Sequence, residues 1–200
     1  MNETEDVQIA IERHGLVLVQ DAKLPNVVRI VSGETLRGSW WSHRDANRIF
    51  AVVESIEAHP DNLATKLVAG KVTFLHRRLW PALLGVALAR EAWQTRALSS
   101  DARALCRAID RGESMQATGP GAKSIEIKLL ARSEQVHTES GKHVTRLEPW
   151  SVWAKRVQCA APLAVVDAKR MLEAAVIGVG GISSLLPWHE RAGKSRVQGT

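Results

Sequence analysis

Two short β-rich segments, about 70 residues apart, constrain the fold of this chain most. The first, residues 63–76, turns at Ala69-Gly70, and the second, residues 134–147, turns at Ser140-Gly141. Each has β-branched and apolar residues on both sides of a turn dipeptide, a pattern typical of a β-hairpin. Gly-Lys, Val-Thr, Leu and Trp follow both turns in the same order. The two hairpins either belong to two copies of one unit or share these common hairpin residues by chance.

Helical patterns surround both hairpins. Ser42, with Asp45 three residues later, forms a capping box, and apolar residues then recur at helical spacing, which predicts a helix over 43–58. Gly119-Pro120-Gly121 is expected to form a turn. Further helices are expected over residues 5–14, 81–93, 100–111, 123–132 and 163–176. The sequence therefore predicts an α+β protein that is mainly helical, with two β-hairpins.

The order of these elements resembles that of a winged helix, in which helices and a small strand precede a β-hairpin. In the second half the pieces are helix 100–111, the segment Ser-Met-Gln-Ala, helix 123–132 and the hairpin. This stretch resembles bacterial winged-helix DNA-binding domains, including the tandem ones of some DNA-repair glycosylases. The segment GSWWSH…KLVAGKVTFLHRRLWPALL also resembles a group of uncharacterised bacterial proteins, which implies no chemistry.

The resemblance covers residues 24–150 and rests on element order. It implies tandem winged-helix-like units over residues 1–96 and 97–158. A C-terminal helical extension with a frayed tail, residues 159–200, is expected to follow them.

Charge is unevenly distributed along the chain. The sequence has 27 Lys and Arg against 21 Asp and Glu, a net charge of +6, of which the first 100 residues carry +1 and the last 100 carry +5. Such a balance is typical of a protein that contacts a polyanion, and it also occurs in proteins that do not. The sequence has no block of five or six like charges, so we expect no disordered basic tail.

The first hairpin and its exit are the best candidate for nucleic-acid contact. In a winged helix this region reaches the phosphate backbone, where Lys and Arg release counterions. A two-residue turn would pair Lys66 with Thr73 and place both with Lys71 on one polar face. The alternative is an ordinary solvated face, with Arg77 and Arg78 only beginning the next helix. The candidate residues are Lys66, Lys71, Thr73, His76, Arg77 and Arg78.

A second candidate contact is the approach to the helix at 43–58. A helix N-terminus offers free N–H groups to phosphate, and an exposed Trp can stack on bases. The alternative is that Trp40 and Trp41 attach the preceding loop to the core, as most indoles do. Here the candidates are Arg37, Trp41, His43 and Arg44, to which the second hairpin adds Lys142 and Arg146.

Catalytic, metal and cofactor motifs are not expected. His137 and His143 flank the second turn, but a two-residue loop would place them on opposite faces, where they cannot hold one ion. Neither GPGAKS nor GVGG has the glycine spacing of a phosphate-binding loop. Cys106 lies on the apolar stripe of its helix, and Glu54 and Glu57 lie on the solvent side of theirs.

The expected function is therefore nucleic-acid binding, with duplex DNA as the favoured partner and RNA as the alternative, in regulation or as an accessory to DNA repair. The alternatives are a nucleic-acid-processing enzyme such as a base-excision glycosylase, and a module that docks a protein partner or a second copy through tryptophans. Two cysteines, an acidic N-terminus and the lack of a long apolar run favour the cytoplasm.

Overall fold

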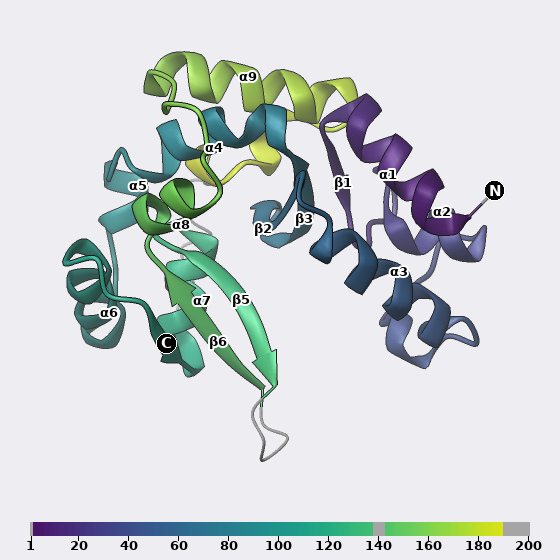
Figure 1. Cartoon of the computed structure of the whole chain (residues 1–200), viewed down its shortest axis with the longest axis horizontal. Coiled ribbons are helices and arrows are strands. Elements are labelled where there is room, and N and C mark those ends of the chain that lie inside the picture. The colour runs from purple at the N-terminus through teal and green to yellow at the C-terminus, as the bar shows by residue number, and fades with distance from the viewer. Residues whose placement is uncertain (1, 138–142, 190–200) are drawn as a thin grey trace, which may run out of the picture.

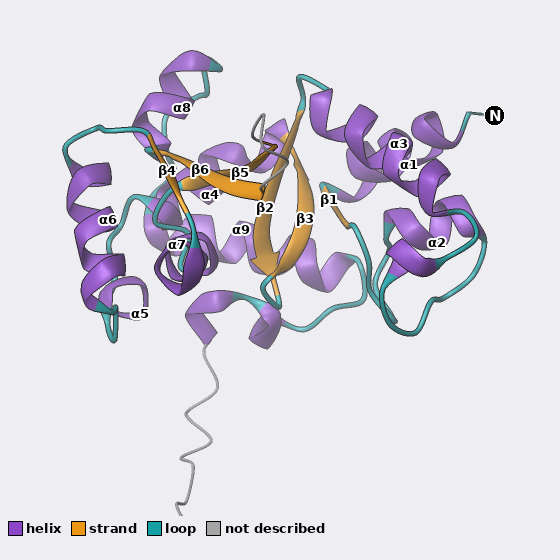
Figure 2. Cartoon of the chain, turned by 90° about the horizontal axis from the view of Figure 1, so that it is seen from below, coloured by secondary structure: helices purple, strands orange, loops and turns teal. Residues whose placement is uncertain are grey.

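The computed structural model describes residues 2–137 and 143–189. The expected fold class is confirmed: the chain is α+β and mostly helical, with two small three-stranded antiparallel sheets. Figure 2 shows the two sheets in the middle of the molecule, with the first three helices on one side and α6 and α7 on the other. In the described ranges, no helix is long and apolar enough to cross a membrane.

The first sheet is built by the N-terminal half. Its elements are α1 (Glu3–His14), β1 (Leu16–Leu18), α2 (Val27–Ser32), α3 (Ala46–Ala58), β2 (Asn62–Val68) and β3 (Lys71–His76). The strand order is β1-β3-β2. Gly15, with φ of 84°, ends α1 by donating its N–H to the Ile11 carbonyl, and this left-handed step turns the chain directly into β1. A helix, strand, two helices and a hairpin thus follow one another in this half of the chain.

The second sheet repeats this order with one helix fewer. Its elements are α6 (Ser100–Asp110), β4 (Met115–Ala117), α7 (Gly119–Ile127), β5 (Arg132–His137) and β6 (His143–Glu148). The strand order is β4-β6-β5, so the first strand of each unit pairs with the last. Ser99 caps α6, since its hydroxyl accepts from the Ala102 N–H at 3.2 Å.

A third group of helices joins the two units. It consists of α4 (Trp80–Ala87), α5 (Ala92–Thr95), α8 (Trp150–Arg156) and α9 (Val165–Gly178). Short 3-10 turns elsewhere in the chain are Trp40–Ser42 before α3, Arg77–Leu79 before α4, and Ser183–Leu185 and Pro187–His189 after α9. One buried cluster contains Leu75 of the first hairpin, Trp80, Trp153 and Leu172, so the main core crosses all three expected segments. α9 lies along α4 at the top of Figure 1, above both units.

Several boundaries differ from the sequence expectations for local reasons. Ser42 does not cap α3, because it belongs to a 3-10 turn in which its hydroxyl donates to the Ser39 carbonyl, and α3 begins at Ala46. The helix expected over 81–93 ends at Ala87, since Arg90 takes a left-handed φ of 52° before α5. The helix expected over 123–132 is also displaced. Gly119 and Pro120 lie inside its first turn, and it ends at Ile127.

The first hairpin turns where expected, but the strand register predicted from the sequence is wrong beyond the turn. Val68 pairs with Lys71, and a bulge between Thr65 and Val68 then places Thr65 opposite Thr73. Thr73 is therefore fully buried rather than on a polar face. Its hydroxyl stays inside the bulge, where it donates to the Lys71 carbonyl at 3.0 Å.

The second hairpin has a longer connection than expected. His137 pairs directly with His143 in the ladder, so the two-residue loop at Ser140-Gly141 is wrong. The argument that placed the two histidines on opposite faces fails with it. Ser140 and Gly141 themselves lie outside the described residues.

Candidate functional site

The turn of the first hairpin does not stand free. The Ala69 N–H donates to the Leu185 carbonyl at 2.7 Å, which docks the turn onto the chain segment that follows α9. The β5–β6 hairpin, in contrast, projects away from the body of the molecule (Figure 1). The tip of the first hairpin is therefore covered by the chain itself, and the candidate surface for a partner lies beside the turn.

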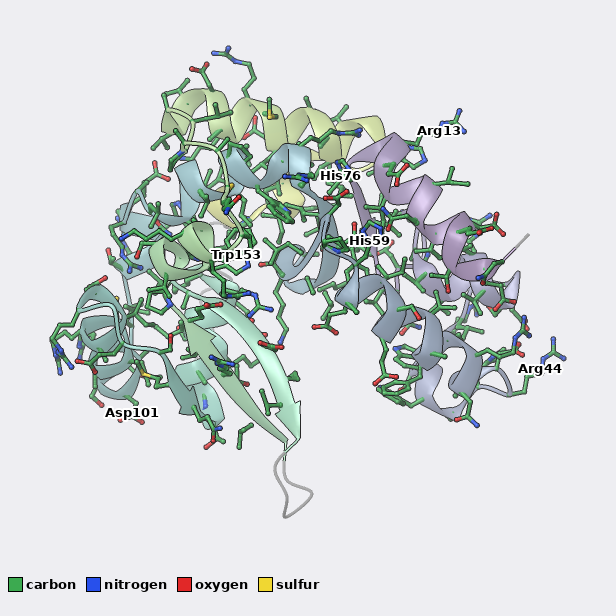
Figure 3. All side chains as sticks on the ribbon, in the orientation of Figure 1. Arg13, Arg44, His59, His76, Asp101 and Trp153 are labelled. Atoms are coloured by element: carbon green, nitrogen blue, oxygen red, sulfur yellow. The ribbon has the colours of Figure 1, made fainter. Side chains whose placement is uncertain are left out.

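The exit of the first hairpin has a bracing role. Arg78 donates to the carbonyls of Glu12 and Arg13 at the end of α1, and Arg77 pairs with Asp61 at 3.0 Å. The His76 ring accepts from the Arg78 N–H, and its pKa is lowered by burial and by the Arg78 charge. Figure 3 shows His76 near Arg13, at the end of the unit away from Arg44. These three candidates lie at the opposite end of the hairpin from Lys71.

Two hollows meet beside the turn of the first hairpin, and we call them together the basic groove. Their volumes are about 680 and 590 Å³, and both are lined by Lys66 and Gly70. The cationic side chains that line the groove are Arg37, Lys66, Lys71, Lys123 and Lys128. Among the described residues lining it, Asp21 is the one carboxylate. The groove is therefore a concave surface of positive charge to which both units contribute.

Several of these cations are held in place by hydrogen bonds. Lys71 pairs with Asp21 at 2.7 Å, and Lys128 donates to the Trp93 carbonyl at 2.6 Å. Burial raises the pKa of Asp21, but hydrogen bonds from the Leu24 N–H and from Lys71 outweigh it, so the net shift is downward. Arg37 and Lys123 are exposed. The groove thus combines anchored cations with solvent-facing ones.

A third hollow, of about 300 Å³, lies between the two units, and we call it the acidic pocket. One wall comes from the first unit and is mostly apolar: Val19, Trp40, Trp41, Val53, Ala64, Val72 and Phe74. The other lining residues are polar: Glu57, Thr65, Lys66, Glu126, Ser133, Glu134 and Gln135. Three carboxylates and one ammonium therefore surround this space. Lys66 lines both the basic groove and the acidic pocket, and so marks their boundary.

The carboxylates of the acidic pocket differ in their partners. Glu126 is buried and accepts from Lys66 at 2.5 Å and from the Ser133 hydroxyl at 2.8 Å. Glu134 pairs with Arg132 at 2.9 Å. Glu57 is exposed at the rim of the pocket and has no hydrogen bond or ion pair within the described part of the chain. Partial burial, followed by the charge of Glu134, raises its pKa. One carboxylate therefore faces the pocket without a cationic partner.

The two tryptophans before α3 form one stacked pair on the apolar wall. Their ring centroids are 4.0 Å apart, with Trp40 buried and Trp41 62% exposed. Trp41 also contacts Phe50 of α3, at 5.6 Å between centroids. Trp40 thus anchors the loop, whereas the largely exposed Trp41 lines the acidic pocket.

The remaining sequence candidates lie apart from the groove. His43 and Arg44 both contact Glu34, at 3.2 and 3.4 Å, which ties the loop before α3 to the end of α2. Arg146 is exposed on β6, and Lys142 lies outside the described residues. Of the twelve candidates, Arg37, Lys66 and Lys71 line the groove, and Trp41 lines the pocket with Lys66.

Metal and thiol chemistry find no support in the described residues. Over these ranges, no group of three or more His, Cys, Asp or Glu side chains is arranged to hold a metal ion. Cys106 is buried in the core cluster on α6, and burial raises the pKa of its thiol.

Sequence reasoning missed Lys123 and Lys128 in the groove. It placed Glu57 on the solvent side of its helix, where the side chain is exposed, but it did not predict the pocket that Glu57 lines. No local signal could have identified them, because each becomes part of a site only when the second unit packs beside the first. Comparison with protein-family models, curated proteins and solved structures finds no match for this chain.

Proposed function

We propose that this chain binds nucleic acid, duplex DNA in the first place, through the basic groove. The observation that carries the proposal is the charge of the groove, which is lined by five cationic side chains from both units and by one carboxylate. Two of these cations, Lys66 and Lys71, are ion-paired with Glu126 and Asp21. Cations that neutralise phosphates release condensed counterions, and this release provides most of the sequence-independent affinity of such proteins. The repeated winged-helix order supports the same interpretation by analogy.

The groove is a better phosphate surface than α3, the helix before the first hairpin. α3 carries Glu54 and Glu57 on its exposed side, and its one arginine, Arg48, pairs with Glu3 and Asp45. Like charge repels phosphate, so we place the backbone contacts beside the hairpin turn and on α7. Sequence readout is not part of the proposal. The unpaired thiols of Cys106 and Cys159 fit a reducing compartment, and we place this function in the cytoplasm.

The test is the salt dependence of binding to a fluorescently labelled random duplex, followed by anisotropy. The double variant Arg37→Ala, Lys123→Ala removes two exposed groove cations without breaking an ion pair of the fold. We expect affinity at low salt to fall by about tenfold or more, and the slope of log K against log salt to decrease by about two.

A matched control removes equal charge elsewhere. Arg170→Ala with Lys155→Ala acts on exposed positions of α9 and α8, outside the groove. Its affinity and salt slope should equal those of the unchanged chain. Equal losses in both double variants would overturn the groove as the binding surface, and salt-independent binding would overturn phosphate contact altogether.

A further inference from the structure

The acidic pocket has a chemical character opposite to that of the basic groove beside it. Three carboxylates and one ammonium line the pocket, whereas five cations and one carboxylate line the groove. Phosphate is therefore repelled from the pocket, and the nucleic-acid function proposed above leaves it unused.

The charge inside the pocket is incompletely balanced. Lys66 neutralises Glu126, and Arg132 is shared between Glu134 at 2.9 Å and the buried Glu148 at 3.3 Å. Glu57 is left without a hydrogen-bonded or ion-paired partner among the described residues. The charges that act on it are those of Glu134 and Glu54, which raise its pKa, and of Arg132, which lowers it. A positive group placed in the pocket would supply the missing partner.

The opposite wall offers a second means of holding a cation. Trp41 is stacked on Trp40 at 4.0 Å, and it is 62% exposed although it is one of the largest apolar side chains in the chain. The face of an indole carries negative potential and attracts cations, Trp more strongly than Tyr or Phe. An aromatic ring can also stack there, so the wall favours a ligand that is both flat and positively charged.

We propose that the acidic pocket binds a small organic cation with a flat aromatic body. Its ring lies against Trp41, and its cationic group donates hydrogen bonds to Glu57. The pocket volume of about 300 Å³ is at the lower end of the range for small-molecule sites, which suits one or two rings. Because Trp41 and Glu57 belong to the first unit, and Glu134 and Gln135 to the second, the ligand would contact both units.

The experiment uses benzamidine as the probe and contains no nucleic acid, so its result is independent of the groove proposal. Ligand-observed NMR titrations compare benzamidine with benzamide, which has similar shape and no charge, and with benzoate, which has the opposite charge. We expect saturable binding of benzamidine, binding of benzamide at least about tenfold weaker, and none of benzoate, since hydrogen bonds between charged groups are the stronger ones.

Variants assign the binding to this pocket. Glu57→Gln should lower benzamidine affinity about tenfold, while Glu54→Gln, one turn earlier on α3 and outside the pocket, should leave it unchanged. Trp41→Ala should weaken the binding of benzamidine and of benzamide alike, because it removes the stacking surface and leaves the carboxylate. Equal affinity for benzamidine and benzamide, or undiminished binding to the Glu57→Gln variant, would overturn the proposal.

Discussion

Glu148 shows how single charges hold the second unit together. It is buried, and it accepts from Arg156 at 2.8 and 3.1 Å and from Arg132 at 3.3 Å, which ties the end of β6 to α8 and to the start of β5. Burial by itself raises the pKa of this carboxyl, but the hydrogen bond and charge of Arg156, with the charge of Arg132, outweigh it. The pKa is lowered below its ordinary value of 4.5.

The lowered pKa has a definite consequence for acid stability. A carboxyl whose pKa is depressed in the folded state contributes stability above the unfolded value of 4.5, and loses it as pH falls through the lower folded value. Glu148→Gln should therefore reduce the free energy of unfolding by about 1–3 kcal/mol at neutral pH. Urea denaturation at several pH values should show the difference shrinking in acid, and a pH-independent difference would contradict the assignment.

The structure places the residues that the sequence singled out in different surroundings. Lys71 and Arg37 lie on the groove, where charge and exposure predicted contact with a polyanion. Thr73 is buried in the bulge, and Arg78 caps the end of α1, although the sequence grouped both with Lys71 as candidate contact residues. Sequence shows that a side chain is polar, but whether water or a carbonyl satisfies it depends on which segment packs beside it.

At the scale of elements, the contact of α4 with α9 decides how the helices cover the first sheet. Gly85 makes it possible, because a Cβ there would lie 2.4 Å from the Leu163 carbonyl oxygen and 2.9 Å from the Ala168 Cβ. The helices could not approach this closely with any other residue. A helix was expected over 81–93, but nothing in its sequence identifies α9 as the partner.

Gly85→Ala should therefore destabilise the fold by about 1–3 kcal/mol, as overpacking does in other cores. The matched control is Gly178→Ala at the end of α9, where a Cβ would meet nothing within 4 Å. This control should be neutral or slightly stabilising, because it reduces the freedom of the unfolded chain. Urea midpoints for the two variants decide the matter, and similar midpoints would mean that α4 and α9 can separate at little cost.

Local signals predicted the elements well and their pairing less well. The Ala69-Gly70 dipeptide located the first turn, and both hairpins form between the expected strands, but Gly119 and Pro120, expected in a turn, lie in the first turn of α7. The bulge at Thr65–Val68 was not predictable, because it depends on Thr73 finding hydrogen-bond partners inside the strand pair. Strand register depends on how two strands pair, and a shift of one residue moves every side chain of a strand to the other face of the sheet.

For the whole molecule, the contact between the units matters most. Lys66 on β2 and Glu126 on α7 lie 60 residues apart in sequence and 2.5 Å apart in space. The pair is largely shielded from water, with side-chain exposures of 24% and 9%. It joins the two units where the basic groove and the acidic pocket meet, so both proposed sites depend on it.

A double-mutant cycle on Lys66→Met and Glu126→Gln measures this contact. Each single variant should lower the free energy of unfolding by about 1–3 kcal/mol, since it leaves a shielded group unpaired. The double variant should recover part of the loss, with a coupling energy of about 0.5–3 kcal/mol. The Lys71–Asp21 pair serves as the comparison: its lysine is 48% exposed, so its coupling should stay below about 1 kcal/mol. Additive losses at Lys66 and Glu126 would show that the pair does not hold the units together.

The sequence by itself determined the local order of the chain: two hairpins, the turn of the first one, most of the helices, and an excess of positive charge. These features arise from interactions between residues a few positions apart, and such interactions can be recognised without knowing the fold. The tertiary structure decided which charges meet. Lys66, Lys71 and Lys123 line one groove, and Trp41 and Glu134 line one pocket, only because the second unit packs against the first hairpin. Electrostatic and apolar contacts depend on distance in space, so residues that are remote in sequence form a site only after the chain has folded.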